Sequence, residues 1–426
     1  MSEKKKSQKL ILGFQHVLAM FGATVLVPAL TGLNTSITLF CAGLGTLVFH
    51  LITKKKVPVF LGSSFAFMGG IIAVLGGSKM GDPGFLDKLS ALKGALIVAG
   101  AIYVAFALLI KLVGYEKVNR LLPPIVTGPI IIVIGLRLSG SAINNAFNWN
   151  GAFSINACIV ALLVVATAVI VSVYTKGIIN LMPILFAIIV GFIVSVPFGF
   201  CDFTGVASAH FFSFMDGDVL AQLLCVPTFR VDAILAVAPI AFVTLIEHVG
   251  DITTNSAVCN QNFMVDPGIH RTIAGDGIAT ALAGLLGGPA NTTYGENTGV
   301  LAVTKNYDPS VIRIAAVIAI IMGIFGKIGG FISCIPGPVT GGISIILYGM
   351  ISAVGVRILI NSRLNFGNSR NLMIAALIFV LGIGCDSVPV AGTVTISGLA
   401  LAAVIGMLLA LILPVGADDV LKEEQH

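Results

Sequence analysis

The apolar residues of this chain fall into long runs that short polar stretches separate. Runs of roughly 20 residues, the length that the hydrocarbon core of a bilayer requires, follow one another almost end to end and predict about 14 transmembrane segments. The predicted segments are 11–30, 35–53, 58–77, 91–112, 123–143, 153–174, 178–199, 232–250, 272–288, 290–304, 311–333, 336–356, 371–388 and 394–414. This pattern predicts an all-α integral membrane protein.

Composition leads to the same class. The chain is 57% hydrophobic and only 10% charged, with a mean hydropathy of +1.04. A soluble domain carries about 25% charged residues, so a water-exposed surface cannot be built from this composition. The first apolar run is long enough to span the membrane and lacks a clear cleavage site, so segment 1 is expected to stay in the mature protein.

The positions of the basic residues predict the topology. With the N-terminus in the cytoplasm, all but six of the 24 Lys and Arg residues lie on the inner side, among them Lys117, Arg120 and Lys422. The six others are Lys79, Lys88, Lys93, Arg137, Arg230 and Lys327. Such asymmetry follows the positive-inside rule and places both termini in the cytoplasm. It explains the net charge of +5 without a nucleic-acid partner.

Three short motifs recur in the same order in the two halves of the chain. The pairs are Gln15-His16-Val17 with Glu247-His248-Val249, Gly62-Ser63-Ser64-Phe65 with Asn291-Thr292-Thr293-Tyr294, and Val126-Thr127-Gly128 with Val339-Thr340-Gly341. Their offsets are 232, 229 and 213 residues. Each half holds seven segments, an odd number, so the second half enters the membrane from the opposite side. Residues 1–230 and 231–426 are therefore predicted to form a 7+7 inverted repeat.

The second motif pair interrupts segments 3 and 10 with residues that weaken helices. Hydroxyl and aromatic side chains such as Ser64, Phe65 and Tyr294 stand where a plain membrane helix carries Leu and Val. Interrupted segments at matching positions of two halves indicate the binding site of a transporter at the midplane. Each segment is expected to be extended first and then helical, so that two helix N-termini point at a common centre. The alternative is a pair of kinked helices whose Ser and Thr bond to their own backbone.

Two acidic residues lie deepest in the predicted membrane region, where ionisable side chains indicate function. Glu247 ends an apolar run, and Glu296 begins the helical part of segment 10. Asp251 lies one turn after Glu247 on the same helix face. All three are candidates for proton coupling, and the alternative is a neutral Glu bonded to neighbouring backbone. Asp276 is expected near the inner end of segment 9 with local hydrogen bonds.

Other chemistry has little support in the sequence. His16 and His248 occupy equivalent positions, and neither has a second His or Cys at metal-ligand spacing, so an architectural role is favoured over a metal site. No nucleophile–base pair or Gly-rich phosphate loop has convincing spacing. We therefore expect neither an enzyme nor a cofactor, and two isolated carboxylates do not favour a channel.

One stretch of segment 10 resembles a family signature. Glu296-Asn297-Thr298-Gly299, followed by Thr304-Lys305, is similar to the signature of the nucleobase/ascorbate transporter family. The two central motifs and Glu247-His248-Val249-Gly250 resemble its uracil-transporting bacterial members in particular. The resemblance runs from Gln15 to about Pro414.

The resemblance implies a fold and a site. Segments 1–4 and 8–11 would form a core domain, segments 5–7 and 12–14 a gate domain, and short β-strands would form where segments 3 and 10 pass each other. Glu247 and Glu296 would hold the base, the backbone around Phe65 and Gly295 would meet its carbonyls, and Tyr348 would lie near the pocket. Family members use a proton gradient, and many are dimers.

The implied function is proton-coupled import of uracil across a bacterial cytoplasmic membrane. An acid at position 296 favours a pyrimidine, whereas Asp251 replaces a His of uracil-transporting relatives and also occurs in purine transporters. A xanthine or purine symporter therefore stays an alternative. Anion transporters with the same inverted fold are a further alternative, which Glu296 opposes because they are expected to carry a basic residue there.

Overall fold

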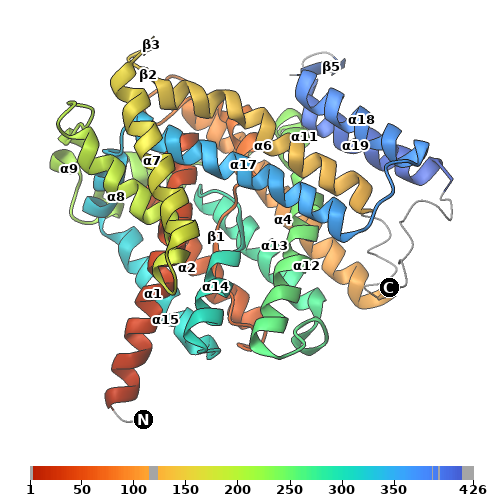
Figure 1. The fold of residues 1–426 in the computed structure, drawn as a ribbon, viewed down its shortest axis with the longest axis horizontal. Coiled ribbons are helices and arrows are strands. Elements are labelled where there is room, and N and C mark those ends of the chain that lie inside the picture. The colour runs from red at the N-terminus through yellow and green to blue at the C-terminus, as the bar shows by residue number, and fades with distance from the viewer. Residues whose placement is uncertain (1–2, 115–122, 386, 392–393, 415–426) are drawn as a thin grey trace.

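A computed structural model describes residues 3–114, 123–385, 387–391 and 394–414 (Figure 1). The predicted inner positions Lys117, Arg120 and Lys422 lie outside the described residues. In the first half the elements are α1 (Glu3–Thr31), α2 (Thr35–Ile52), β1 (Leu61–Ser63), α3 (Met68–Leu75), α4 (Phe85–Val113), α6 (Pro124–Phe147), β2 (Asn148–Trp149), β3 (Ala152–Phe153), α7 (Ile155–Tyr174), η1 (Ile179–Leu181), α8 (Pro183–Ser195), α9 (Thr204–Ser208), η2 (Ser213–Met215) and α10 (Gly217–Leu224).

The second half repeats much of this order. Its elements are α11 (Val231–Val237), α12 (Ile240–Cys259), η3 (Met264–Gly268), α13 (Ile269–Leu286), β4 (Asn291–Thr293), α14 (Gly295–Thr304), α15 (Pro309–Ile324), α16 (Gly326–Ser333), α17 (Gly337–Asn361), α18 (Ser369–Gly384), β5 (Ser387–Ala391), β6 (Val394–Ser397) and α19 (Gly398–Ile412). Every predicted segment coincides with at least one helix.

The helices have the length and composition of membrane spans. Within the described residues, seven stretches are long and apolar enough to cross a bilayer: Ser7–Thr31, Thr35–Ile52, Phe85–Val113, Pro124–Phe147, Ile155–Tyr174, Val231–Cys259 and Gly337–Asn361. Four shorter apolar helices are Pro183–Ser195, Pro309–Ile324, Ser369–Gly384 and Leu401–Ile412. The chain is a multi-pass, predominantly helical membrane protein.

Segments 3 and 10 are broken as predicted, and their extended parts cross. Strand β1 pairs antiparallel with β4, with Leu61 opposite Thr293 and Ser63 opposite Asn291. Outside the strands, the Ser64 N–H donates to the carbonyl of Ala290 at 2.9 Å. These bonds satisfy backbone groups that no lipid can pair, which is why extended chain is tolerated inside the protein at membrane depth.

Helix packing follows a matched scheme. Helix α2 packs against α15, and α4 packs against α13; likewise α7 contacts α8, and α18 contacts α19. Helices α6 and α17 lie along each other (Figure 1). Each contact has a counterpart in the other half of the chain. The α2–α15 contact corresponds to α13–α4, and the α7–α8 contact corresponds to α18–α19. Figure 1 also shows α6, α17, α18 and α19 in the upper part of the molecule and α2, α12, α13 and α14 below them.

Besides segments 3 and 10, several predicted segments are not single helices. Segment 13, predicted over 371–388, ends in β5, and segment 14, predicted over 394–414, begins with β6, which pairs with β5. Segment 7, predicted over 178–199, contains η1 and the short helix α8.

Segments 11 and 8 are interrupted within their apolar runs. The prediction of one span over 311–333 is wrong, because the helix stops at Phe325, whose backbone is extended. At this break the backbone pairs with residues 211–212. Phe325 forms a β-bridge with Phe212, and the Gly326 N–H donates to the carbonyl of Phe211. Segment 8, predicted over 232–250, is interrupted at Pro239 and continues to Cys259, so that Asp251 lies inside α12 rather than at its end.

Close helix contacts generate a prediction about stability. A methyl group on Gly43 of α2 would meet Ile320 of α15, with Cγ1 at 2.7 Å and the backbone nitrogen at 2.9 Å. We expect Gly43→Ala to lower the free energy of unfolding by about 1–3 kcal/mol, since overpacking forces backbone shifts. Thermal unfolding in detergent measures this effect.

The matched control is Gly140→Ala in α6, where nothing lies within 4 Å of the added carbon. This change should stabilise by about 0.5–1 kcal/mol, because alanine has less backbone freedom to lose. Equal unfolding midpoints for the two variants would contradict the close packing of α2 and α15.

Candidate substrate site

Two threonines hold the crossing strands from behind. The Thr46 side chain of α2 accepts the Leu61 N–H at 2.9 Å and lies 3.2 Å from the Leu61 carbonyl. The Thr280 hydroxyl of α13 donates to the carbonyl of Asn291 at 2.7 Å. Each strand is therefore fastened to the helix that precedes it, by the same side-chain type in both halves.

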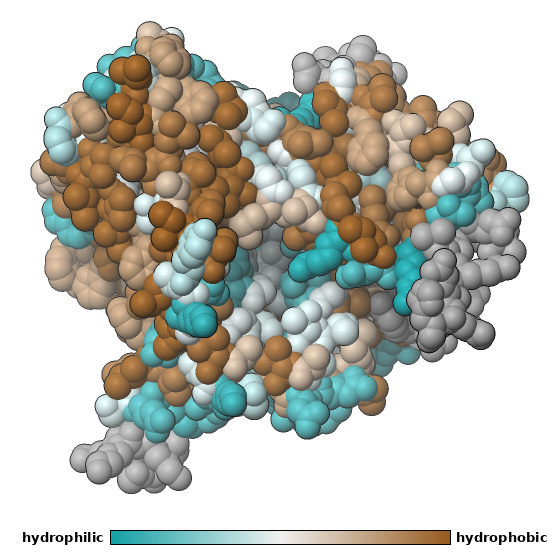
Figure 2. Space-filling model, viewed as in Figure 1, coloured by the Kyte–Doolittle hydropathy of each residue, from teal (hydrophilic) through white to brown (hydrophobic). Residues whose placement is uncertain are grey.

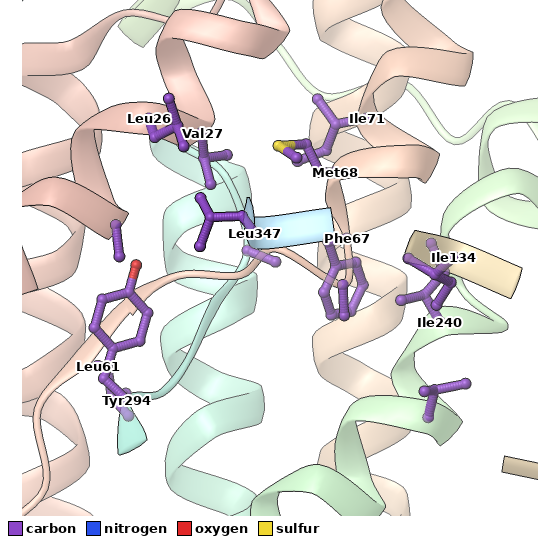
Figure 3. Close-up of a cluster of buried hydrophobic side chains, with 14 of the residues drawn as sticks. Leu26, Val27, Leu61, Phe67, Met68, Ile71, Ile134, Ile240, Tyr294 and Leu347 are labelled. Atoms are coloured by element: carbon purple, nitrogen blue, oxygen red, sulfur yellow. The ribbon is translucent and has the colours of Figure 1, made fainter. Parts of the chain in front are cut away.

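Tyr294 fastens the crossing to α1. Its hydroxyl donates to the Ser63 carbonyl at 2.8 Å and lies 3.3 Å from the Thr24 hydroxyl. Figure 3 shows the ring beside Leu61 with the hydroxyl pointing toward α1. Only glycine fits at position 62, because a Cβ there would lie 2.8 Å from the Tyr294 oxygen and closer still to the ring.

Helix α14 begins directly after this crossing. Its N-cap residue, Tyr294, makes no side-chain capping bond, and the Glu296 carboxylate interacts with its own backbone N–H. An uncapped N-terminus carries about half a positive charge and suits anions or carbonyl oxygens. The two signature residues that follow Glu296 orient the helix rather than point into a site. Asn297 donates to the His16 carbonyl at 3.0 Å and to its ring Nδ1 at 3.1 Å, and Thr298 accepts from Asn255 at 3.2 Å.

Asp276 is more important than the sequence indicated. The prediction of a local role near the inner end of segment 9 is wrong, because Asp276 is fully buried and bonds to two other elements. Its carboxylate lies 2.8 Å from Nδ1 of His248 in α12 and accepts the Thr293 N–H of β4 at 3.2 Å. The predicted architectural role of His248 is confirmed by this contact. Sequence spacing could not reveal it, since the three residues come from separate elements.

Three acidic side chains gather in front of the crossing. Glu247 is exposed, while Asp251 and Glu296 are half-buried. Asp251 Oδ1 lies 3.6 Å from where a Cβ of Gly295 would be, which places it beside the start of α14. Each carboxylate is close enough to feel the others electrostatically. Within the described part of the chain, Glu247 and Asp251 have no hydrogen-bonded or ion-paired side chain.

A basic residue that the sequence did not identify acts on this cluster. Arg357 of α17 attracts both Glu247 and Asp251, although it forms no ion pair with either in the described structure. It is exposed and lies about one turn before the end of α17 at Asn361. Helix α17 packs against α6. A basic residue 110 positions from Glu247 gives no sequence signal for such an electrostatic influence.

The remaining predicted site residues lie in different surroundings. Ser64 is buried and Phe65 is half-buried, both between β1 and α3. Gly295 is exposed at the start of α14. Tyr348 is 1% exposed within α17, where Ser344 and Ser141 lie near its hydroxyl. Among the described residues, no group of three or more His, Cys, Asp or Glu side chains could hold a metal.

The molecular surface is hollowed next to this cluster. Figure 2 shows a central depression with pale and teal residues between brown lobes, in the region where Figure 1 places α12, α14 and α17. Exposed Glu247 and Gly295 belong to elements that border it. Ionisable side chains at membrane depth indicate function, so these carboxylates beside a helix N-terminus are the candidate substrate site.

Solved structures share the fold. The transmembrane domain of a cyanobacterium bicarbonate transporter, BicA, matches with a TM-score of 0.64 and 16% identity over 96% of this chain and 98% of that chain. The overall structure of SLC26A9 matches with a TM-score of 0.69 and 12% identity over 97% of this chain and 66% of that chain. At these identities the likeness shows the shared fold alone.

Sequence comparison gives the family. A model described as "Permease family" matches residues 7–391, so the chain belongs to this family of transporters, which are not enzymes. A uracil permease of Bacillus caldolyticus is 46% identical over 98% of this chain and 95% of its own length. Uracil permeases of Bacillus subtilis and Escherichia coli K12 are 41% and 36% identical, over 97% and 95% of this chain and 94% and 91% of their own. The resemblance to nucleobase transporters is confirmed.

The buried His248–Asp276 contact generates a second prediction. Asp276→Asn removes a charge and replaces an acceptor by a donor beside the His248 ring and the Thr293 N–H. Breaking a buried pair in this way costs about 3–5 kcal/mol, so the unfolding midpoint should fall sharply. The matched control is Asp232→Asn, whose partner Arg230 is exposed and lies at 2.6 Å. An exposed pair contributes about 0–1 kcal/mol, and equal losses in both variants would contradict the role of Asp276.

Proposed function

We propose that this protein imports uracil together with protons by alternating access. The observation that carries the proposal is the set of carboxylates around the uncapped start of α14, in a chain 46% identical to a uracil permease. Glu247 and Glu296 are assigned to the base. Phe65 and Gly295 contribute backbone N–H groups, Ser64 and Tyr294 hold that backbone, and Tyr348 lies on the gate side.

The donors and acceptors of the site complement those of uracil. The base has ring N–H donors, which suit carboxylate acceptors, and carbonyl oxygens, which suit backbone N–H groups at a helix start. Glu247 and Glu296 supply the acceptors, and the first turn of α14 supplies donors. An anion as substrate would meet three repelling carboxylates, so the geometry disfavours the anion-transporter alternative.

The same carboxylates support proton coupling. Three acids that repel one another at membrane depth are costly when all are charged, and taking up a proton relieves that cost. Glu247, Asp251 and Glu296 are the groups that we assign to this step. Asp251 lies beside Gly295, so its charge also bears on the start of α14.

We further propose the 7+7 inverted repeat, with residues 1–230 and 231–426 as its halves. Segments 1–4 and 8–11 form a core domain and segments 5–7 and 12–14 a gate domain. The recurrence of the same helix contacts in both halves supports this division. Both termini are placed in the cytoplasm of a bacterial inner membrane, and a homodimer through the gate domains is included in the proposal.

Glu296→Gln tests the substrate assignment. The change removes an acceptor charge and a titratable proton, and we expect binding of uracil to weaken about 10- to 150-fold, equivalent to about 1.5–3 kcal/mol. Isothermal titration of the purified protein measures it, and unlabelled xanthine in competition checks the purine alternative. Asp218→Asn, which changes an exposed acid in the first turn of α10, is the control. Unchanged uracil affinity in Glu296→Gln would contradict the assignment of Glu296 to the base. A preference of the parent protein for xanthine would contradict uracil as the substrate.

Proteoliposomes test the coupling. Vesicles at neutral pH placed in acidic buffer should accumulate labelled uracil, because an inward proton gradient protonates the outward-facing carboxylates. A protonophore should abolish the accumulation. Dependence on a sodium gradient, with no response to the protonophore, would show that protons are not the coupling ion.

A further inference from the structure

A second charged cluster lies away from the substrate site, where three helices end. Lys54 follows the end of α2, Lys111 lies in the last turn of α4, and Arg271 lies in the first turn of α13. All three are near enough to His270 for their positive charges to act on its ring. Arg271 Nη1 also donates to the Ile52 carbonyl at 3.2 Å, which ties the start of α13 to the end of α2.

No acidic side chain neutralises this cluster within the described residues. The nearest acid before it in the chain, Asp266, is paired with Lys56 at 2.5 Å. Helix α13 has no acid in its first turn, and its N-cap, Gly268, makes no side-chain capping bond. Lys54 and Lys111 are exposed. The cluster therefore has excess positive charge and unpaired donors on an accessible surface.

Two apolar stripes run from this cluster along the outside of the helices. On α4 the exposed residues Ala101, Ala105, Leu108 and Leu112 recur at helical spacing. On α13 the face of Arg271 continues through Ile278, 39% exposed, and Leu285, 50% exposed, at intervals of seven residues. The stripes are adjacent, because α4 and α13 cross closely at Gly100, where a Cβ would lie 2.8 Å from the backbone nitrogen of Ala281.

We propose that this surface binds one anionic glycerophospholipid, with its phosphate among Lys54, Lys111 and Arg271 and an acyl chain along α4 and α13. The charge of the cluster complements the phosphate, and the stripes offer an apolar path that begins at the cations. A free phosphate would use only the cations. A phospholipid would contact both the cations and the apolar stripes, and we therefore propose a lipid rather than a free phosphate.

Binding of phosphatidylglycerol and of phosphatidylcholine with identical acyl chains tests the proposal. Native mass spectrometry of the purified full chain in detergent gives the dissociation constant of each lipid. Phosphatidylglycerol should bind more tightly to the parent protein. A juxtamembrane lysine contributes about 1 kcal/mol, or about fivefold, so Lys54→Gln/Lys111→Gln should weaken binding of phosphatidylglycerol about 25-fold.

The matched control is Lys79→Gln/Lys176→Gln, which removes two exposed lysines elsewhere and should bind like the parent. Unfolding midpoints without lipid establish that both double variants fold. The proposal is overturned if the two lipids bind equally, or if Lys54→Gln/Lys111→Gln keeps the parental affinity for phosphatidylglycerol. It is also overturned if equimolar inorganic phosphate displaces the lipid, because the site would then recognise a free anion.

Discussion

The pairing of β1 with β4 is the contact on which the rest of the molecule depends. Two extended segments inside a membrane protein carry backbone groups that lipid cannot satisfy, and each strand supplies the partners of the other. Because the pairing is antiparallel, the helices that follow leave the crossing in opposite directions. Their first turns stay near it. The same backbone requirement therefore creates both the break in each helix and the polar centre between the two breaks.

Buried side chains make that crossing rigid. Thr46 and Thr280 bond to the strands from the helices before them, Tyr294 links them to α1, and Asp276 joins β4 to His248. The signature residues Asn297 and Thr298 extend this network to His16 and Asn255. Much of what characterises the sequence thus holds the start of α14 in place. Fewer residues, led by Glu247 and Glu296, are assigned to the proposed contact with the substrate.

The sequence predicted the elements whose cause is local. Hydroxyl and aromatic residues in place of Leu and Val revealed the two broken segments, and apolar run lengths gave the spans. It did not predict features that arise when distant segments meet. The helix break at Phe325 depends on pairing with Phe211 and Phe212, and the role of Asp276 depends on α12 and β4. The influence of Arg357 depends on where α17 is placed in the fold. None of these three features leaves a hydrophobic periodicity in the sequence that could predict it.

The charge of the site now has a structural context. Glu247, Asp251 and Glu296 repel one another, and Arg357 of α17 attracts Glu247 and Asp251. In the proposed division α17 belongs to the gate and α12 to the core, so we expect this attraction to act between the two domains.

The most direct test of the proposed substrate site is the structure of the protein with uracil bound. The account predicts uracil within hydrogen-bond distance of the Glu247 and Glu296 carboxylates and the first N–H groups of α14. Uracil bound elsewhere, with these carboxylates untouched, would contradict it.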